Sequence, residues 1–163
     1  MINKIIIVSG NDGTGKTTVV TKINSSKSNV FAAERSMAIT DENRSLFRQI
    51  DVNFLDQQTL IQTFDRPLVD LPVSVNGIPV YYIILDVDEE VSLKRLESRT
   101  SRDKWETPRA LHYFRRRFTE LSYYFGIPLI KNHDSLDSTI ENIFSAVENY
   151  SSAINKSYEI NNY

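Results

Sequence analysis

With 163 residues, the chain is long enough for one domain, which at this size buries about 70% of the surface of its unfolded chain. Hydrophobic residues make up 40% and charged residues 25% of the sequence, and the net charge is -2, which excludes a disordered or fibrous chain. The absence of cysteine excludes a disulfide scaffold, a thiolate metal site and a cysteine nucleophile.

Targeting signals are not evident. No apolar run reaches the roughly 20 residues that cross a bilayer. The first predicted strand begins at Ile5, which leaves no room for a signal peptide. We therefore expect a cytoplasmic protein without a membrane partner.

Short apolar runs alternate along the chain with segments of helical periodicity. Residues 5–8 are typical of a strand buried on both faces, and a glycine-containing loop and a helix follow them. Asp88 can cap a second helix, and Thr107 with Pro108 predicts the start of a third that ends at Gly126. Apolar residues at helical spacing predict a last helix over 136–147. Further strands are predicted at 30–33, 60–64, 80–85 and 127–130.

This alternation predicts the α/β class. Strands that alternate with helices form right-handed crossovers and a parallel sheet covered on both faces. We expect a three-layer sandwich of about five strands, with ligands at their carboxyl ends. Residues 1–150 form the single predicted domain, and residues 151–163 form a polar C-terminal tail, interpreted as a frayed helix end.

The sequence Gly10-Asn11-Asp12-Gly13-Thr14-Gly15-Lys16-Thr17 matches G-x-x-x-x-G-K-[ST] between a predicted strand and a predicted helix. Such a loop turns its backbone N–H groups toward phosphate oxygens, and the helix adds the positive end of its dipole. Lys16 can then reach the β- and γ-phosphates, and the Thr17 hydroxyl can ligate Mg²⁺. We therefore predict ATP and Mg²⁺ as cofactors, with a P-loop NTPase fold. The predicted ATP-binding residues are Asn11, Asp12, Gly13, Thr14, Gly15, Lys16, Thr17 and Thr18.

Basic residues gather after the fourth predicted strand. Residues 94–117 hold nine of the 19 Lys and Arg residues. Arg95, Arg99 and Arg102 are spaced so that a continuing helix would present them on one face, where Arg99 and Arg102 could close over ATP. For Arg115, Arg116 and Arg117 we favour solvation or salt bridges.

Residues 10–18 resemble the phosphate loop of thymidylate kinases and related deoxynucleoside monophosphate kinases. Phe64-Asp65-Arg66 resembles the Asp-Arg motif of that family, and residues 84–91 resemble its fourth strand and the helix after it. Residues 99–106 resemble its arginine-bearing lid. The resemblance spans residues 4–131, and the phosphate loop is its specific part. Two features differ: only residues 67–79 stand where the family has a long helical insertion, and Glu34-Arg35-Ser36 stands where it has Arg-Glu-Pro. A compact member of this kind would suit a viral genome.

The resemblance and the chemistry of phosphoryl transfer together suggest roles for individual residues. Catalysis is assigned to Lys16, Arg66, Arg99 and Arg102, since the transition state is anionic. Acceptor binding is assigned to Asp12, Arg35, Phe47, Asp65 and Arg66, of which Arg66 can hold a phosphate through two hydrogen bonds. Thr17 and Asp65 are the predicted metal residues. Asp86 is either a residue near the magnesium water shell or a loop cap.

The predicted function is an ATP-dependent nucleoside monophosphate kinase that phosphorylates dTMP or another dNMP, as a monomer or a homodimer. A phosphate acceptor is largely ionised at pH 7 and needs no base. Two alternatives remain. A polynucleotide 5′-hydroxyl or a small metabolite could be the acceptor, with Asp65 or Asp12 as the base, and only there would nucleic acid be a partner. The chain could also be a GTPase-like switch or a non-catalytic nucleotide-binding module.

Overall fold

The computed structural model describes residues 1–34, 37, 40, 41, 43–45, 73–99 and 106–161. Within these residues, four of the five strands of the sheet are parallel and lie in the order β2, β1, β4, β5, which confirms the predicted parallel arrangement. Their bounds are β1 Lys4–Gly10, β2 Val30–Ala33, β4 Ile78–Asp86 and β5 Leu129–Lys131. The predicted strand at 60–64 lies outside the described residues.

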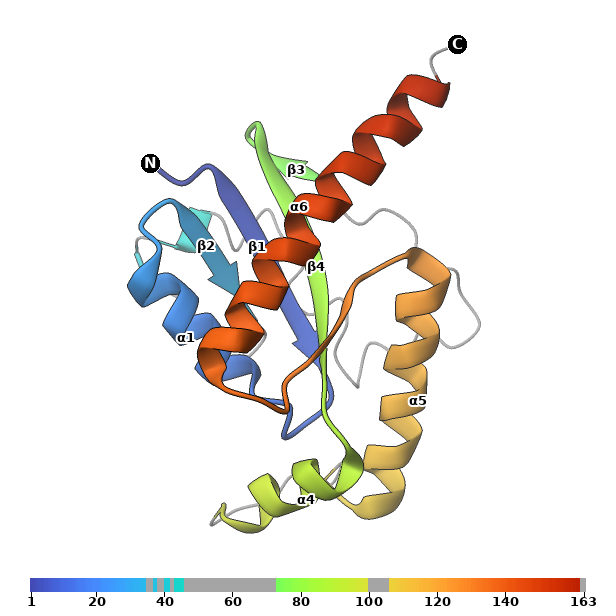
Figure 1. Cartoon of the computed structure of the whole chain (residues 1–163). Coiled ribbons are helices and arrows are strands. Elements are labelled where there is room, and N and C mark those ends of the chain that lie inside the picture. Colours follow the sequence, from blue (N-terminus) through green and yellow to red (C-terminus); the bar gives the residue numbers. More distant parts are fainter. Residues whose placement is uncertain (35–36, 38–39, 42, 46–72, 100–105, 162–163) are drawn as a thin grey trace.

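Helices cover both faces of the sheet (Figure 1). Helix α1, Lys16–Ser26, and helix α6, Leu136–Asn161, pack on one face through Val19, Ile23 and Ile143. Helix α5, Pro108–Phe125, packs on the other face through Phe114 and Phe118. The three layers confirm the predicted α/β sandwich.

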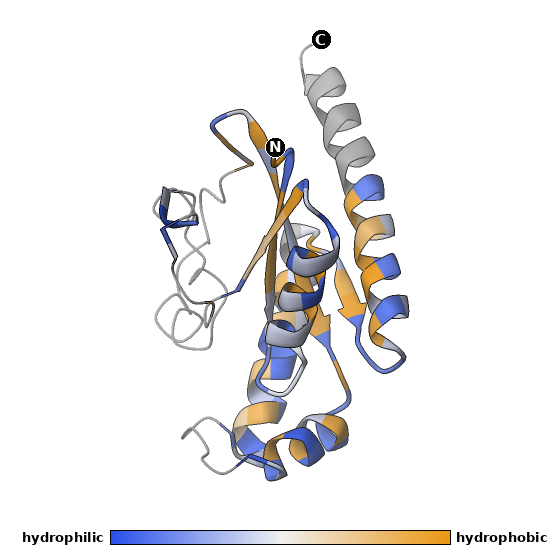
Figure 2. Ribbon diagram, turned by 90° about the vertical axis from the view of Figure 1, so that its left-hand side faces the viewer, coloured by the Kyte–Doolittle hydropathy of each residue, from blue (hydrophilic) through white to orange (hydrophobic). Residues whose placement is uncertain are grey.

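The strands are largely hydrophobic, whereas the helices have mixed surfaces (Figure 2). Every residue of the run at 5–8 is buried, because neighbours in a strand point to opposite faces and both faces are covered. Among the described residues, no helix combines the length and the apolar character needed to cross a membrane.

Helix α5 has the predicted bounds. The Thr107 hydroxyl accepts a hydrogen bond of 3.2 Å from the Ala110 N–H, Pro108 occupies the first turn, and Gly126 is the C-cap. Helix α6 continues to Asn161, so most of the segment 151–163 is helical.

The sheet also contains an antiparallel strand that the sequence analysis missed. Strand β3, Ser74–Val75, pairs with the start of β4 through a two-residue turn. Both turn residues, Asn76 and Gly77, have positive φ (52° and 79°), the combination that a tight hairpin requires and that Asn-Gly adopts readily. Strand β5 begins later than predicted, at Leu129, although the Pro128 carbonyl already accepts a hydrogen bond from the Ile84 N–H.

These elements place the carboxyl ends of β1, β2 and β4 at one end of the molecule. Helix α4, Glu89–Glu97, lies beyond that end, at the bottom of Figure 1. The carboxyl ends of the strands are the edge at which ligands of parallel α/β sheets are expected.

Candidate active site

The phosphate loop lies between the end of β1 and the start of α1, as predicted. Gly15 is the N-cap of α1 and has a φ of 89°. A Cβ atom at this position would lie 2.6 Å from Asn132 Nδ2, so both the backbone conformation and the close approach of Asn132 require glycine.

The Lys16 ammonium lies against the first residues of the loop. Its Nζ donates hydrogen bonds of 2.9 Å to the Gly10 carbonyl and 2.8 Å to the Asn11 carbonyl. This places a positive charge within the loop, where the motif requires it for contact with phosphate oxygens.

Two polar side chains of the loop are used to hold it together. Asn11 Nδ2 donates to the Leu111 carbonyl of α5 at 2.8 Å, and Asn11 Oδ1 accepts from the Asp12 N–H at 3.0 Å. The Thr14 hydroxyl donates to the Asn11 carbonyl at 2.7 Å. Asn11 and Thr14 are both buried, so their predicted part in phosphate binding would fall to their main-chain groups.

Thr17 is paired with a carboxylate to which the sequence analysis assigned no role. Glu34 directly follows β2, its exposed fraction is 1%, and its Oε1 accepts a 3.1 Å hydrogen bond from the Thr17 hydroxyl. Strands β1 and β2 are parallel neighbours, so the residues after their carboxyl ends meet. The signal was present in the sequence: Glu34 is the first charged residue after an apolar strand, the same criterion that singled out Asp86.

The Thr17–Glu34 pair has the chemistry of a magnesium site. A hydroxyl and a carboxylate are hard oxygen ligands, and Mg²⁺ in phosphate-binding sites commonly takes one or two protein oxygens, with water and phosphate oxygens completing its shell. Thr17 therefore fits its predicted role, with Glu34 as its neighbour. Asp65, the other predicted metal residue, lies outside the described residues.

Asp86 belongs to an ion-pair network that joins β4 to α5. Arg115 donates to both carboxylate oxygens of Asp86, at 3.0 and 3.2 Å, and also to Asp88 at 3.2 Å. The hydrogen bond to Asp86 is the main cause that raises the pKa of Arg115. The salt-bridge hypothesis for Arg115 is thus confirmed, and Asp86 is committed to a bidentate contact.

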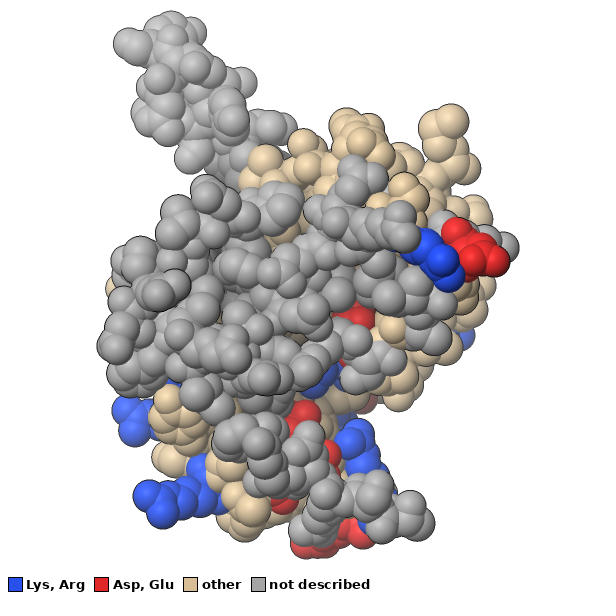
Figure 3. Space-filling model, turned by 180° about the vertical axis from the view of Figure 1, so that it is seen from behind, with Lys and Arg blue, Asp and Glu red and all other residues tan. Residues whose placement is uncertain are grey.

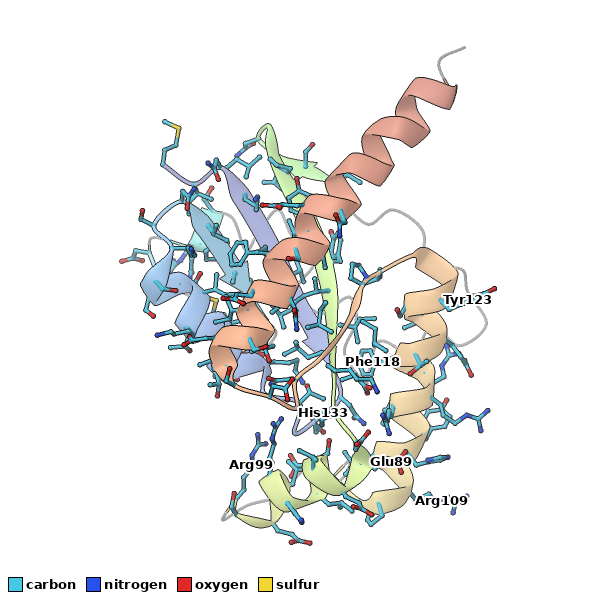
Figure 4. The ribbon with its side chains drawn as sticks, viewed as in Figure 1. Glu89, Arg99, Arg109, Phe118, Tyr123 and His133 are labelled. Carbon is cyan, nitrogen blue, oxygen red and sulfur yellow. The ribbon has the colours of Figure 1, made fainter. Side chains whose placement is uncertain are left out.

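The same network explains a difference from expectation at α4. Asp88 occupies the N-cap position but makes no side-chain capping bond, since its carboxylate contacts Arg115. The two histidines also have partners here: His112 Nδ1 lies 2.8 Å from Glu89 Oε1, and the Asp88 N–H donates to His133 Nε2 at 3.0 Å. Glu89 and His133 are labelled in Figure 4 at this end of the molecule.

The helix that would have to continue for Arg95, Arg99 and Arg102 to share one face does not reach Arg99. Helix α4 ends at Glu97, where the Ser98 hydroxyl bonds to the Arg95 carbonyl at 2.8 Å and competes with further helical hydrogen bonds. Arg95 points to the phosphate loop, whereas Arg99 pairs with the buried Glu106 at 3.4 Å.

The structure therefore brings together the loop residues, Lys16, Thr17 and Glu34, with Arg95 and Asn132 contacting the loop from outside. Acidic and basic side chains are interspersed on the surface at this end (Figure 3). The remaining predicted site residues lie outside the described residues: Arg35, Phe47, Asp65, Arg66 and Arg102.

Comparison of the sequence with known proteins finds a relative that is much longer than this chain. No family model matches the chain. The bifunctional cordycepin biosynthesis cluster protein 3 of the fungus Cordyceps militaris is 37% identical over 152 residues, which are 88% of this chain and 17% of that protein. The chain thus spans about a sixth of the length of this relative.

Comparison of the structure finds kinases. A gluconokinase from Sinorhizobium meliloti 1021 superposes with a TM-score of 0.52 at 14% identity, covering 95% of this chain and 97% of its own. A deoxyadenosine kinase from M. mycoides, solved with bound dCTP, superposes with a TM-score of 0.50 at 13% identity, covering 89% of this chain and 99% of its own. The chain has the fold of such P-loop kinases.

Proposed function

We propose that this chain is an ATP-dependent, Mg²⁺-requiring phosphotransferase. The observation that carries the proposal is the arrangement at the ends of β1 and β2, where Lys16 lies against the phosphate loop and Thr17 contacts Glu34 at 3.1 Å. This arrangement can hold a triphosphate and a divalent cation side by side.

The proposed residues act by position and charge. The backbone N–H groups of the loop and the start of α1 would hold the β- and γ-phosphates, and Lys16 would neutralise charge as the bond between the γ-phosphorus and the bridging oxygen breaks. Thr17 and Glu34 would hold Mg²⁺, which supplies charge neutralisation on the phosphate oxygens. An acceptor oxygen forms the new bond to the γ-phosphorus, and ADP leaves.

For the acceptor, the motif resemblance supports a (deoxy)nucleoside monophosphate, dTMP or another dNMP, as in thymidylate-kinase-like enzymes. Asp12, Arg35, Phe47, Asp65 and Arg66 would then hold the acceptor, and Arg99 and Arg102 would add positive charge over ATP. Its small-molecule partners would be ATP and the nucleotide acceptor. A homodimer and a cytoplasmic location remain predictions from the sequence.

A second acceptor class is favoured by Glu34. A hydroxyl acceptor must lose a proton during transfer, and a buried carboxylate beside the phosphate loop is suited to accept it. The two kinases of similar fold are named for a sugar acid and a nucleoside, both of which carry hydroxyl groups. A nucleoside or a small hydroxylated metabolite is therefore the second candidate.

The test is a transfer assay with Mg²⁺ and γ-labelled ATP against separate panels of dNMPs, NMPs, nucleosides, sugar acids and 5′-hydroxyl oligonucleotides. Label in a nucleoside diphosphate supports the first acceptor class, and label in a nucleoside monophosphate or a sugar phosphate supports the second. Lys16→Met should abolish transfer, whereas Lys22→Met, which removes a lysine from the same helix away from the loop, should not. ATP binding without transfer to any acceptor would overturn the proposed activity.

A further inference from the structure

Two side chains from distant parts of the chain hold carbonyl groups of the phosphate loop. Arg95 Nη1 of α4 donates to the Gly13 carbonyl at 3.1 Å. Asn132 Nδ2, from the connection between β5 and α6, donates to the Thr14 carbonyl at 2.8 Å. The two contacts fall on consecutive peptide units of the loop.

These contacts determine where the neighbouring N–H groups point. A trans peptide unit is planar, with its C=O and N–H directed to opposite sides. The described residues contain no cis peptide bond. When Arg95 holds the Gly13 carbonyl, the Thr14 N–H points away from α4, and when Asn132 holds the Thr14 carbonyl, the Gly15 N–H points away from Asn132.

The two side chains are themselves fixed in place. Arg95 Nη2 donates to the Asn132 carbonyl at 3.0 Å. One guanidinium therefore contacts both the Gly13 carbonyl and Asn132, the residue that holds the Thr14 carbonyl. Asn132 Oδ1 accepts from the Thr139 hydroxyl at 2.7 Å, and the Asn132 N–H donates to the Asp86 carbonyl at 2.9 Å. Asn132 and Thr139 are both buried.

We infer that Arg95 and Asn132 are positioning residues that orient the Thr14 and Gly15 N–H groups for a polyphosphate before it binds. The inference rests on the proposed function in one respect, namely that the polyphosphate is the triphosphate of ATP. Preorganised donors bind an anion without the cost of reorienting the loop. The role requires the guanidinium of Arg95, because a single ammonium cannot reach the Gly13 and Asn132 carbonyls in the same geometry.

The experiment measures binding of MgATP and of tripolyphosphate with Mg²⁺ by calorimetry, with amide spectra of the ¹⁵N-labelled chain. Arg95→Lys keeps the charge and loses the fork, so it should weaken both ligands by about tenfold and shift the Thr14 amide resonance before any ligand is added. Lys94→Ala, which removes an exposed charge from the neighbouring position, should bind both ligands as the wild type does. Thr139→Val, which frees the Asn132 side chain without touching the loop, should weaken both ligands and shift the Gly15 amide.

Three outcomes would overturn the inference. Arg95→Lys could bind both ligands as tightly as the wild type, which would reduce the role of Arg95 to its charge. Arg95→Lys could weaken ATP but not tripolyphosphate, which would place Arg95 on the nucleoside. The wild-type Thr14 and Gly15 amides could fail to respond to tripolyphosphate. If instead both amides respond and Arg95→Lys weakens both ligands, but no acceptor is phosphorylated, the inference holds and the proposed function fails.

Discussion

Glu34 shows how a single residue can change the interpretation of the whole site. It is buried at the end of β2 and hydrogen-bonded to Thr17, at a distance of 17 positions along the chain. Lys16 and Thr17 could be placed at the phosphate loop from the sequence, because this loop is a local motif with fixed spacing. The position of Glu34 after an apolar strand is visible in the sequence, but its partner Thr17 is not. Arg95 and Asn132 could not be assigned, since their contacts depend on which strands and helices become neighbours.

Replacing Glu34 by Gln should lower kcat at least about a hundredfold for a hydroxyl acceptor, because the amide cannot take up a proton. The amide oxygen can still accept the hydrogen bond from Thr17, so the fold should be retained and the melting temperature should change little. Steady-state kinetics with the acceptor found in the transfer assay would measure the effect.

Glu97→Gln, an exposed position at the end of α4, is the matched control. If Glu34 acts only by holding Mg²⁺, a higher Mg²⁺ concentration should restore activity to Glu34→Gln. An unchanged kcat at all Mg²⁺ concentrations would show that Glu34 has neither role.

Among the elements, those with local end signals were predicted well. The bounds of α5 follow from Thr107, Pro108 and Gly126, each of which acts through its own backbone. The end of α4 could not be predicted, because the arginine spacing suits a longer helix, whereas the Ser98 hydroxyl bonds to the Arg95 carbonyl. Strand β3 was missed because two residues are too few for a periodic pattern.

The Asp86–Arg115 ion pair should contribute measurably to the packing of α5 on β4. Removal of Arg115 leaves the buried Asp86 carboxylate without its bidentate partner, although the arginine side chain is 27% exposed and water can partly compensate. We expect Arg115→Met to lower the free energy of unfolding by about 2 kcal/mol in urea titrations.

Arg116→Met removes an exposed charge from the next position and should change the stability by less than about 0.5 kcal/mol. The double variant Asp86→Asn with Arg115→Met should recover part of the loss, because the buried charge is gone. Equal stability of Arg115→Met and Arg116→Met would show that the pair contributes nothing net.

At the scale of the whole molecule, the three layers could be predicted because strands alternate with helices and the strands are apolar on both faces. The order of strands could not, since periodicity does not say which edge of β1 receives β2 and which receives β4. The acceptor side also stays a prediction, because Arg35, Phe47, Asp65 and Arg66 lie outside the described residues.

Removal of residues 151–163 tests the predicted domain boundary. The buried side chains of α6 are Thr139, Ile140, Ile143 and Val147 within its described part, and the segment after Tyr150 is mostly polar. The truncated chain should therefore melt within a few degrees of the full chain and bind MgATP equally well. Ile143→Ala, at 0% exposure, should cost about 2–5 kcal/mol and serves as the positive control. A comparable loss on truncation would assign these residues to the domain itself.

The pairing of β1 has a consequence for the order of events as the chain folds. Ile5 lies opposite Phe31 on one side and Val80 on the other, so the first partner arrives through a short crossover and the second only after a much longer loop closes. The side chains that hold the phosphate loop, Arg95 and Asn132, arrive later still in the sequence. An N-terminal fragment, or a chain still emerging from the ribosome, would thus carry the complete phosphate-binding motif without a loop ready to bind. If the chain binds nucleotide as proposed, binding would become available only near completion of the fold, and a ligand that binds there would select chains that have finished folding.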